Sequence, residues 1–366
     1  MIDEASLTRF VTLDEEGYFV IDGLRVSDQA LGAEWLAKIQ IDDRGRSYFN
    51  DNDAGGDYKV IVEAFDQPLV ALDILVAGKN SEIWTARFPY GVEKEFIPET
   101  LCFDEWDRFH LRTKDGVPAV LSRSAQARFF QAATDYDDES VTFAGRTIQL
   151  KPCFEETPAA ENSNWWSEIY RSGHLRWDLG AAHPLLDELL PPLKFTKSRV
   201  LILGCGLGHD AAWWEKRGHI VTAVDFSEEA IAKAKSLYGE SSTLRWHTLD
   251  AFQLPANWSS SFDIIFEHTM YCAIPPHRRA DLCKVWWRLL SPRGRVLGIV
   301  PAMDKSVGPP YGGTEWELRR RLLEPLRKTK RSLFRPLIWK RLRNSHGRRF
   351  GRELFFIVER GDSATD

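Results

Sequence analysis

The sequence predicts an α/β protein with a doubly wound, mostly parallel sheet that is preceded by a β-rich domain. From Trp165 onward, short apolar runs alternate with helical patterns, which is typical of parallel strands joined by crossover helices. Before Pro152, short alternating runs are separated by clusters of Gly, Asp and Asn, which are typical of strands and turns. We therefore expect a β-rich N-terminal domain over residues 1–152 and an α/β domain over residues 153–366.

Length and composition limit the class of protein. A chain of 366 residues with 43% hydrophobic and 12% aromatic residues is long enough for two domains with separate cores. A formal net charge of −5 argues against a general binder of polyanions. Residues 1–6 are acidic and polar, unlike a signal peptide, and no run of about 18 apolar residues occurs. We expect a soluble, cytoplasmic protein, whose oligomeric state the sequence leaves open.

The cysteine pattern also favours a cytoplasmic location. They are odd in number, are scattered and contain no Cys-x-x-Cys pair. This pattern predicts neither a disulfide framework nor a structural zinc site, and it favours a reducing compartment. The five positions are Cys102, Cys153, Cys205, Cys272 and Cys283.

The predicted elements of the first domain are short. We expect strands at residues 18–21, 59–62 and 81–86, and a helix at residues 27–37. No catalytic constellation is visible in this part of the sequence. Regulation, dimerisation and substrate presentation all stay open as its role.

The second domain has the clearer pattern. Its strands are expected at residues 199–203, 220–224, 244–248, 263–266, 295–300 and 354–359. Helices are expected between them, at residues 210–216, 228–238 and 278–290. Ser227, followed by two glutamates, predicts the N-cap of the second of these helices.

A glycine-rich turn follows the first of these strands. Gly204, Gly206 and Gly208 are spaced Gly-x-Gly-x-Gly, whereas a dinucleotide fingerprint is Gly-x-Gly-x-x-Gly. The spacing disfavours a nicotinamide oxidoreductase and suits a ligand without a pyrophosphate, such as S-adenosylmethionine (SAM). The alternative is a strand-to-helix turn that binds no ligand. Cys205, between the glycines, is expected to be a small buried residue rather than a nucleophile.

Two acids follow the next two strands. Asp225, with Phe226 beside it, stands where a carboxylate can accept hydrogen bonds from two ribose hydroxyls at the sheet's carboxyl edge. Its alternative role is a helix-capping acid. Asp250, followed by Ala251 and Phe252, is placed to hold an adenine ring and its amino group. A plain turn aspartate is an equally open interpretation of Asp250.

Several motifs in order resemble the thiopurine S-methyltransferase family. They begin with Trp166-x-x-x-Tyr170-x-x-Gly173 and Trp177-Asp-Leu-Gly, and the glycine-rich turn with His209-Asp210 follows. The stretch 266–279 looks closest to the halide/thiol methyltransferase branch, and residues 308–311, 315–318 and 349–354 match later family segments. The resemblance covers about residues 165–360. It implies a seven-stranded class I methyltransferase sheet with the last strand antiparallel.

The resemblance also implies a function. A methyl group would pass from SAM to a small soft nucleophile (a thiol, sulfide, selenol, thiopurine or halide), with S-adenosylhomocysteine as the other product. Such an in-line displacement needs alignment and desolvation more than proton transfer. The lack of an obvious triad or metal cluster agrees with this, and we expect no metal.

The implied site has a cofactor side and an acceptor side. Trp166, Tyr170 and Trp177 are expected to stack on adenine or to face the sulfonium, or else to pack against the sheet. Glu267 and His268 end the fourth strand. They are expected at the transfer site, with Glu267 also near the cofactor.

His268 is a departure from the thiopurine enzymes, where an Asp-Arg or Glu-Arg pair often stands, so it weakens any transfer of thiopurine specificity. It is a candidate base, with an orienting role as the alternative. Tyr311, in a stiff Gly-Pro-Pro-Tyr loop, is a candidate to cover the acceptor. Arg278 and Arg279 are expected on a solvated helix face.

The segment 319–352 is rich in basic residues with aromatic residues among them. This pattern is found on surfaces that bind nucleic acid or anionic membranes. A nucleic-acid methyltransferase is therefore one alternative function, and a SAM-binding regulator without turnover is another. The competing explanation of the segment is a solvated helix face.

Overall fold

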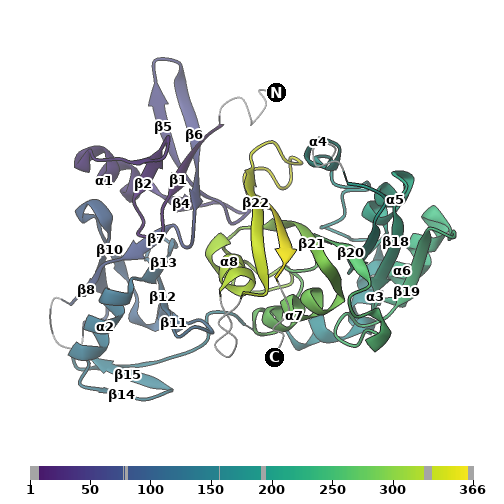
Figure 1. The fold of residues 1–366 in the computed structure, drawn as a ribbon. Coiled ribbons are helices and arrows are strands. Elements are labelled where there is room, and N and C mark those ends of the chain that lie inside the picture. The colour runs from purple at the N-terminus through teal and green to yellow at the C-terminus, as the bar shows by residue number, and fades with distance from the viewer. Residues whose placement is uncertain are drawn as a thin grey trace. The chain divides into compact units, whose positions relative to one another are not determined.

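A computed structural model describes residues 8–76, 78, 81–155, 157–190, 195–324 and 332–361 (Figure 1). The chain divides into two compact units. Unit 1 contains Met1–Glu155 and two later segments, Met303–Ser306 and Thr314–Trp316. Unit 2 contains Glu156–Ala302, Val307–Gly313 and Glu317–Asp366. Among the described residues, no helix is long and apolar enough to cross a membrane.

Unit 1 is made of small sheets around one hydrophobic core. A six-stranded sheet has the order β3-β2-β1-β6-β5-β4, and a four-stranded sheet has the order β11-β12-β13-β7. Two three-stranded sheets, β10-β9-β8 and β14-β15-β16, complete it. The core includes Phe19, Phe49, Trp84 and Phe96, all essentially without exposed surface. Burial of large aromatic side chains is what allows strands this short to form a stable unit.

The elements of unit 1 are mostly shorter than seven residues. The strands are β1 (Thr8–Leu13), β2 (Phe19–Ile21), β3 (Leu24–Arg25), β4 (Gln40–Ile41), β5 (Ser47–Asp53), β6 (Gly56–Ala64), β7 (Leu69–Ala71), β8 (Asp73–Leu75), β9 (Trp84–Arg87), β10 (Glu93–Phe96), β11 (Cys102–Phe103), β12 (Phe109–Arg112), β13 (Pro118–Leu121), β14 (Asp135–Tyr136), β15 (Ser140–Phe143) and β16 (Arg146–Gln149). The helices are α1 (Gln29–Lys38) and α2 (Arg123–Ala132).

One expectation about the cysteines is wrong. Cys102 and Cys153 form a disulfide bond, with their Cα atoms 4.9 Å apart. Backbone pairing brings them together, because Phe103 donates to Lys151 O and Cys153 donates to Phe103 O at 2.9 and 3.0 Å. The two cysteines are 51 positions apart in the sequence, so no spacing argument could predict this contact. The other three cysteines are free thiols.

Unit 2 contains one seven-stranded sheet with the order β19-β18-β17-β20-β21-β23-β22 (Figure 1). The first five strands in this order pair in parallel, and β23 pairs antiparallel with both of its neighbours. The predicted fold class is confirmed, since the last strand of the chain is the antiparallel one. The strands are β17 (Arg199–Leu203), β18 (Ile220–Asp225), β19 (Leu244–Thr248), β20 (Phe262–His268), β21 (Leu290–Pro301), β22 (Phe334–Leu342) and β23 (Glu353–Arg360).

The helices of unit 2 cover both faces of this sheet. Alternate residues of β17 show the two faces, since Leu201 and Leu203 pack in one buried cluster and Val200 and Ile202 in another. The first cluster contains residues of α7 and α8, and the second contains residues of α4, α5 and α6. The helices are α3 (Ser163–Ser172), α4 (Leu186–Leu189), α5 (His209–Lys216), α6 (Glu228–Tyr238), α7 (Arg279–Leu289) and α8 (Glu315–Leu323).

Among the strands of the seven-stranded sheet, β22 is the one for which the sequence analysis gave no range. It lies in the basic segment, where a helix face was the competing explanation, and it forms the edge of the sheet. Its side chains are mostly partly or fully exposed, and its register shifts between Pro336 and Ile338. An edge strand with a proline and a bulge lacks the continuous apolar run by which its buried neighbours were recognised.

Candidate active site

The glycine turn between β17 and α5 is shaped by close neighbours. Gly206 and Gly208 have φ angles of +53° and +80°, which residues with a Cβ rarely adopt. A Cβ on Gly206 would lie 2.9 Å from the Tyr170 hydroxyl, and one on Gly208 would lie 2.4 Å from the Trp246 ring. A Cβ on Gly204 would approach Met270, in the loop after β20. The turn is therefore bare backbone enclosed by the segments that the sequence assigned to the site.

Asp225 ends β18 and binds this turn. One carboxylate oxygen accepts from Gly206 N and the other from Ser227 N, each at 2.9 Å. The side chain is almost fully buried, and burial raises the pKa of Asp225 to about 6. It is therefore ionised at neutral pH, and each oxygen still has a lone pair for a ligand hydroxyl. Ser227 caps α6 as predicted, accepting from Ala230 N.

The aromatic residues before the sheet form one cluster. The Trp177 ring lies edge-on to those of Trp166 and Tyr170, with centroids 5.5 and 5.7 Å apart. Trp166 Nε1 donates to Ala160 O at 2.8 Å, which fixes the orientation of its indole. Phe226 packs against the same cluster. The structure thus places the predicted aromatic wall beside the glycine turn and the Asp225 strand end.

Asp250 lies on the neighbouring strand end, two residues beyond β19. Its carboxylate accepts from Phe252 N at 2.9 Å and from Gln253 Nε2 at 3.2 Å. These are the contacts of a turn aspartate, the alternative that the sequence left open. Ala251 is buried, and the Arg278 guanidinium lies 3.9 Å above the Phe252 ring.

Burial sets the direction of the pKa shifts of the titratable groups around the glycine turn and at the end of β20. Burial raises the pKa of the Cys205 thiol well above its usual range, so the thiol is neutral. Burial also raises the pKa of Glu267 to about 8 and that of Cys272 to about 12. Glu267 is 1% exposed and accepts from Tyr271 N at 2.8 Å. At neutral pH, Glu267 is therefore mainly a protonated acid.

His268 has both ring nitrogens engaged. Nδ1 lies 2.7 Å from Asp210 Oδ2, and Nε2 contacts the Arg349 guanidinium. A guanidinium only donates, so Nε2 must accept and Nδ1 must carry the proton that Asp210 accepts. This arrangement orients the ring firmly, and a role as base would require Nε2 to leave Arg349.

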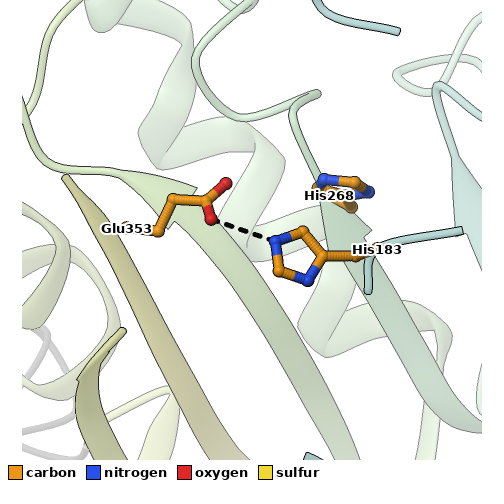
Figure 2. A group of neighbouring side chains, drawn as sticks. All are labelled: His183, His268 and Glu353. Carbon is orange, nitrogen blue, oxygen red and sulfur yellow. Dashed lines mark hydrogen bonds and ion pairs between the residues drawn. The ribbon is translucent and has the colours of Figure 1, made fainter. Parts of the chain in front are cut away.

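The atoms of His183, His268 and Glu353 that could bind a metal lie within 4.8 Å of one another (Figure 2). His183 Nε2 lies 3.0 Å from Glu353 Oε2, and its Nδ1 accepts from Leu185 N at 3.3 Å. Burial alone would raise the pKa of Glu353, but the hydrogen bond with His183 and the charge of Arg349 lower it to about 2. Arg349 already supplies the positive charge, so the donor set fits a closed hydrogen-bond network better than a cation site.

Tyr311 is fully buried and joins three segments. Its N–H donates to Cys272 O at 2.7 Å, and its hydroxyl accepts from Thr157 N at 3.2 Å. Thr157 Oγ1 in turn donates to Gly308 O at 2.8 Å. Hydrogen bonds therefore hold the loop of Tyr311 to the segment before α3 and to the loop after β20.

The expectation of a solvated Arg279 is wrong. Arg279 has no exposed surface, and its Nη1 lies 2.9 and 3.0 Å from the two Glu317 carboxylate oxygens. Arg321 Nε and the Tyr271 hydroxyl also donate to Glu317, at 3.0 and 3.2 Å. Glu317 and Arg321 lie four residues apart on α8, but nothing in the sequence pairs them with Arg279 on α7.

Arginines of the basic segment also bind within the unit. Arg335 pairs with Glu359, and Arg319 lies over the Trp339 ring. Arg348 and Arg349 donate to backbone carbonyls of residues 176–178. The part of the segment that contains Lys328 and Lys330 lies outside the described residues.

Comparison with known proteins decides the family. The thiopurine S-methyltransferase profile matches residues 161–336. Thiocyanate methyltransferase 1 of Brassica oleracea is 33% identical over 158 residues, which are 42% of this chain and 69% of that protein. The chain belongs to the thiopurine S-methyltransferase family. It is therefore a SAM-dependent methyltransferase, as the motifs predicted.

Two further relatives are also methyltransferases by name. Probable thiol methyltransferase 2 of Arabidopsis thaliana is 26% identical over 177 residues, covering 46% of this chain and 76% of that protein. Thiopurine S-methyltransferase of Aliivibrio fischeri (strain MJ11) is 25% identical over 173 residues, covering 42% and 80%. The family match begins at residue 161, so most of unit 1 lies outside it.

Proposed function

We propose that the enzyme methylates a small soft nucleophile: a thiol, sulfide, selenol, thiopurine or halide. The observation that carries this proposal is that the names of three relatives indicate the same kind of methyl acceptor. Thiocyanate, thiol and thiopurine methyltransferases all act on a sulfur-containing acceptor. Sulfur nucleophiles are therefore the first acceptors to test.

The chemistry at the end of β20 supports such an acceptor. Glu267 is mainly protonated at neutral pH, the Cys272 thiol is neutral, and both nitrogens of His268 are engaged. SAM supplies a methyl group on a sulfonium that is already activated for displacement. A thiolate, sulfide or halide attacks it without losing a proton, so alignment and exclusion of water are sufficient.

The proposed cofactor site lies at the ends of β17, β18, β19 and β20. Asp225 would accept ribose hydroxyls through its remaining lone pairs, and the turn would face the amino-acid end of SAM. The proposed cofactor-binding residues are Trp166, Tyr170, Trp177, Gly204, Cys205, Gly206, Gly208, Asp225, Phe226, Asp250, Ala251, Phe252 and Glu267.

On the acceptor side, we assign Tyr311, Glu267 and His268 mainly to positioning. Tyr311 holds its loop against Thr157 and Cys272, and Glu267 as an acid holds the backbone of the loop after β20. His268 links the end of β20 to Asp210 in the first turn of α5. Each thereby sets the distance between the cofactor turn and the acceptor.

Calorimetric titration with SAM and S-adenosylhomocysteine tests the cofactor proposal. A methyl-transfer screen over thiols, sulfide, thiocyanate, iodide, a thiopurine and bulk RNA then tests the acceptor. We expect micromolar binding and turnover on a small sulfur compound or halide. Binding without turnover on any of them would favour a regulator, and turnover on RNA alone would favour a nucleic-acid methyltransferase.

The alternative of a nucleic-acid substrate has less support from the described residues. Arg319, Arg335, Arg348 and Arg349 of the basic segment contact groups of the same unit. Strongly salt-dependent binding of RNA or DNA would be needed to revive it.

We retain residues 1–152 and 153–366 as the proposed functional division. The first part would be a β-rich module of separate role and the second the methyltransferase. A cytoplasmic location is likewise a proposal. A disulfide bond between Cys102 and Cys153 is unusual in a reducing compartment. The test is whether these two cysteines are oxidised or reduced in protein that is purified under thiol-blocking conditions.

A further inference from the structure

Two adjacent arginines bind three successive backbone carbonyls. Arg348 donates to Arg176 O at 3.3 Å and to Asp178 O at 2.6 Å. Arg349 donates to Trp177 O, between them. The two segments are about 170 residues apart in the chain, so this pairing is purely tertiary. We call residues 174–180, which form no helix or strand, the strap.

The strap carries Trp177 to the cofactor side of the unit. The Trp177 ring contacts Tyr170 edge-on, and a Cβ added to Gly206 of the glycine turn would lie 2.9 Å from the Tyr170 hydroxyl. The strap is also held at Asp178, whose carboxylate lies 3.1 Å from His209 Nε2 at the start of α5. A shift of the strap would therefore move Trp177 relative to the turn.

Arginine suits this task better than lysine. Its planar guanidinium presents several N–H donors in fixed directions, so that Arg348 reaches two carbonyls at once. Hydrogen bonds from a charged donor are stronger than neutral ones. They give a strap without secondary structure a defined backbone position, which its own sequence does not supply.

Arg349 is itself firmly held. It is buried, and its Nη1 lies 3.2 Å from Glu353 Oε1 and contacts His268 Nε2. These partners, Glu353 and His268, belong to β23 and β20 of the seven-stranded sheet. Arg349 thus links the backbone of the strap to the sheet. Arg348, which is exposed, adds two further hydrogen bonds to the strap.

We propose that Arg348 and Arg349 are positioning residues for the cofactor, which hold the Trp177 strap against the glycine turn. The inference rests on the proposed cofactor site. It assigns the last arginine pair of the basic segment to SAM binding in place of nucleic-acid binding.

The test uses the full-length protein with Arg348→Ala, because this exposed residue can be removed without opening the core. We expect the SAM dissociation constant to rise about five- to tenfold, the size expected for lost charge-assisted hydrogen bonds. The acceptor KM at saturating SAM should stay within about twofold. Arg348→Lys should restore part of the affinity. Arg245→Ala is the matched control, because it removes an exposed arginine near the start of β19, which pairs with Glu240.

A double-mutant cycle with Trp177→Ala separates positioning from general stability. If Arg348 acts through the strap, Arg348→Ala should weaken SAM binding little further once Trp177 is gone. Unchanged SAM affinity in Arg348→Ala, or full additivity in the cycle, would overturn the proposal. Failure of the wild-type protein to bind SAM would instead contradict the proposed function itself.

Discussion

Two carboxylates at the ends of the strands that flank β17 illustrate how the proposed cofactor side and the proposed acceptor side of the site differ. Asp225 after β18 and Glu267 in β20 are both buried, and burial raises the pKa of both. Asp225 reaches only about 6, because backbone N–H groups of Ser227, Gly206 and Phe226 favour its ionised form. Glu267 reaches about 8. At neutral pH, the cofactor side therefore presents a negative charge and the end of β20 a neutral acid.

This difference matches the two tasks. Ribose hydroxyls are donors, and an ionised carboxylate is the best acceptor for them. A soft anionic acceptor would be repelled by a second carboxylate charge, so a protonated Glu267 suits the acceptor side. Changes on the two sides should therefore affect SAM binding and acceptor turnover separately.

The largest effect is expected for Asp225→Ala. SAM affinity should fall at least tenfold, because hydrogen bonds to a charged group contribute about 1.5–3 kcal/mol. Calorimetry on the folded variant measures this. Asp250→Ala should weaken SAM binding less than Asp225→Ala, because the Asp250 carboxylate already accepts hydrogen bonds from Phe252 N and Gln253 Nε2 of its own turn. An unchanged affinity in Asp225→Ala would remove this residue from the site.

The pH dependence of SAM binding should show the ionisation of Asp225. Because its pKa in the free protein is about 6, the binding form is lost as the pH falls below 6. The SAM dissociation constant should then rise by up to about tenfold per pH unit. Titrations between pH 5 and 8 measure this, and an affinity independent of pH over that range would contradict an ionised Asp225 in the site.

Tyr311→Phe should affect the acceptor side alone. Losing the hydroxyl leaves Thr157 N–H without its partner and loosens the loop over Cys272, which costs about 1 kcal/mol. We expect acceptor kcat/KM to fall severalfold with SAM affinity unchanged, and Tyr311→Ala to have a larger effect of the same kind. Thr157→Val, which removes only the bond to Gly308 O, should have a smaller one. Equal losses for SAM and acceptor would mean that the loop is only structural.

The smallest effect on SAM binding is expected for Glu267→Gln, which should change stability instead. The folded-state pKa of Glu267 lies above its ordinary value of 4.5, so its contribution to stability is full below that pH and is lost as the pH rises toward 8. Glutamine cannot ionise, so the variant should gain relative to wild type across this window. One pKa unit corresponds to about 1.4 kcal/mol, so the melting temperature of the variant relative to wild type should rise by roughly 5–10 °C from pH 5 to pH 8. Parallel stability curves for the two proteins would show that Glu267 is not buried as an acid.

The local features around the glycine turn could be predicted from the sequence, whereas the contacts between distant segments could not. The glycine spacing, Asp225 and its strand, and the cap at Ser227 are local patterns, so each was visible in a few consecutive residues. Glu317 with Arg279 and Arg349 with Trp177 are contacts between distant segments, and no periodicity connects them. His268 was recognised as a site residue, but its ring is occupied by partners from α5 and from the segment before β23.

In unit 1, even more of the structure depends on contacts between distant segments, which the sequence does not predict. Its β-rich character could be predicted, since short alternating runs and turn residues are local. The Cys102–Cys153 bond and the order of its four sheets depend on pairings across tens of residues.

The central claim is methyl transfer from SAM to a small soft nucleophile. The most direct test is to incubate the enzyme with SAM and a set of thiols, sulfide, thiocyanate and iodide, and to measure S-adenosylhomocysteine and the methylated product by mass spectrometry. We predict that both products form in equal amounts with at least one of these acceptors and that Asp225→Ala at limiting SAM reduces both together. Tight SAM binding with no product from any of them would contradict the proposed acceptor class.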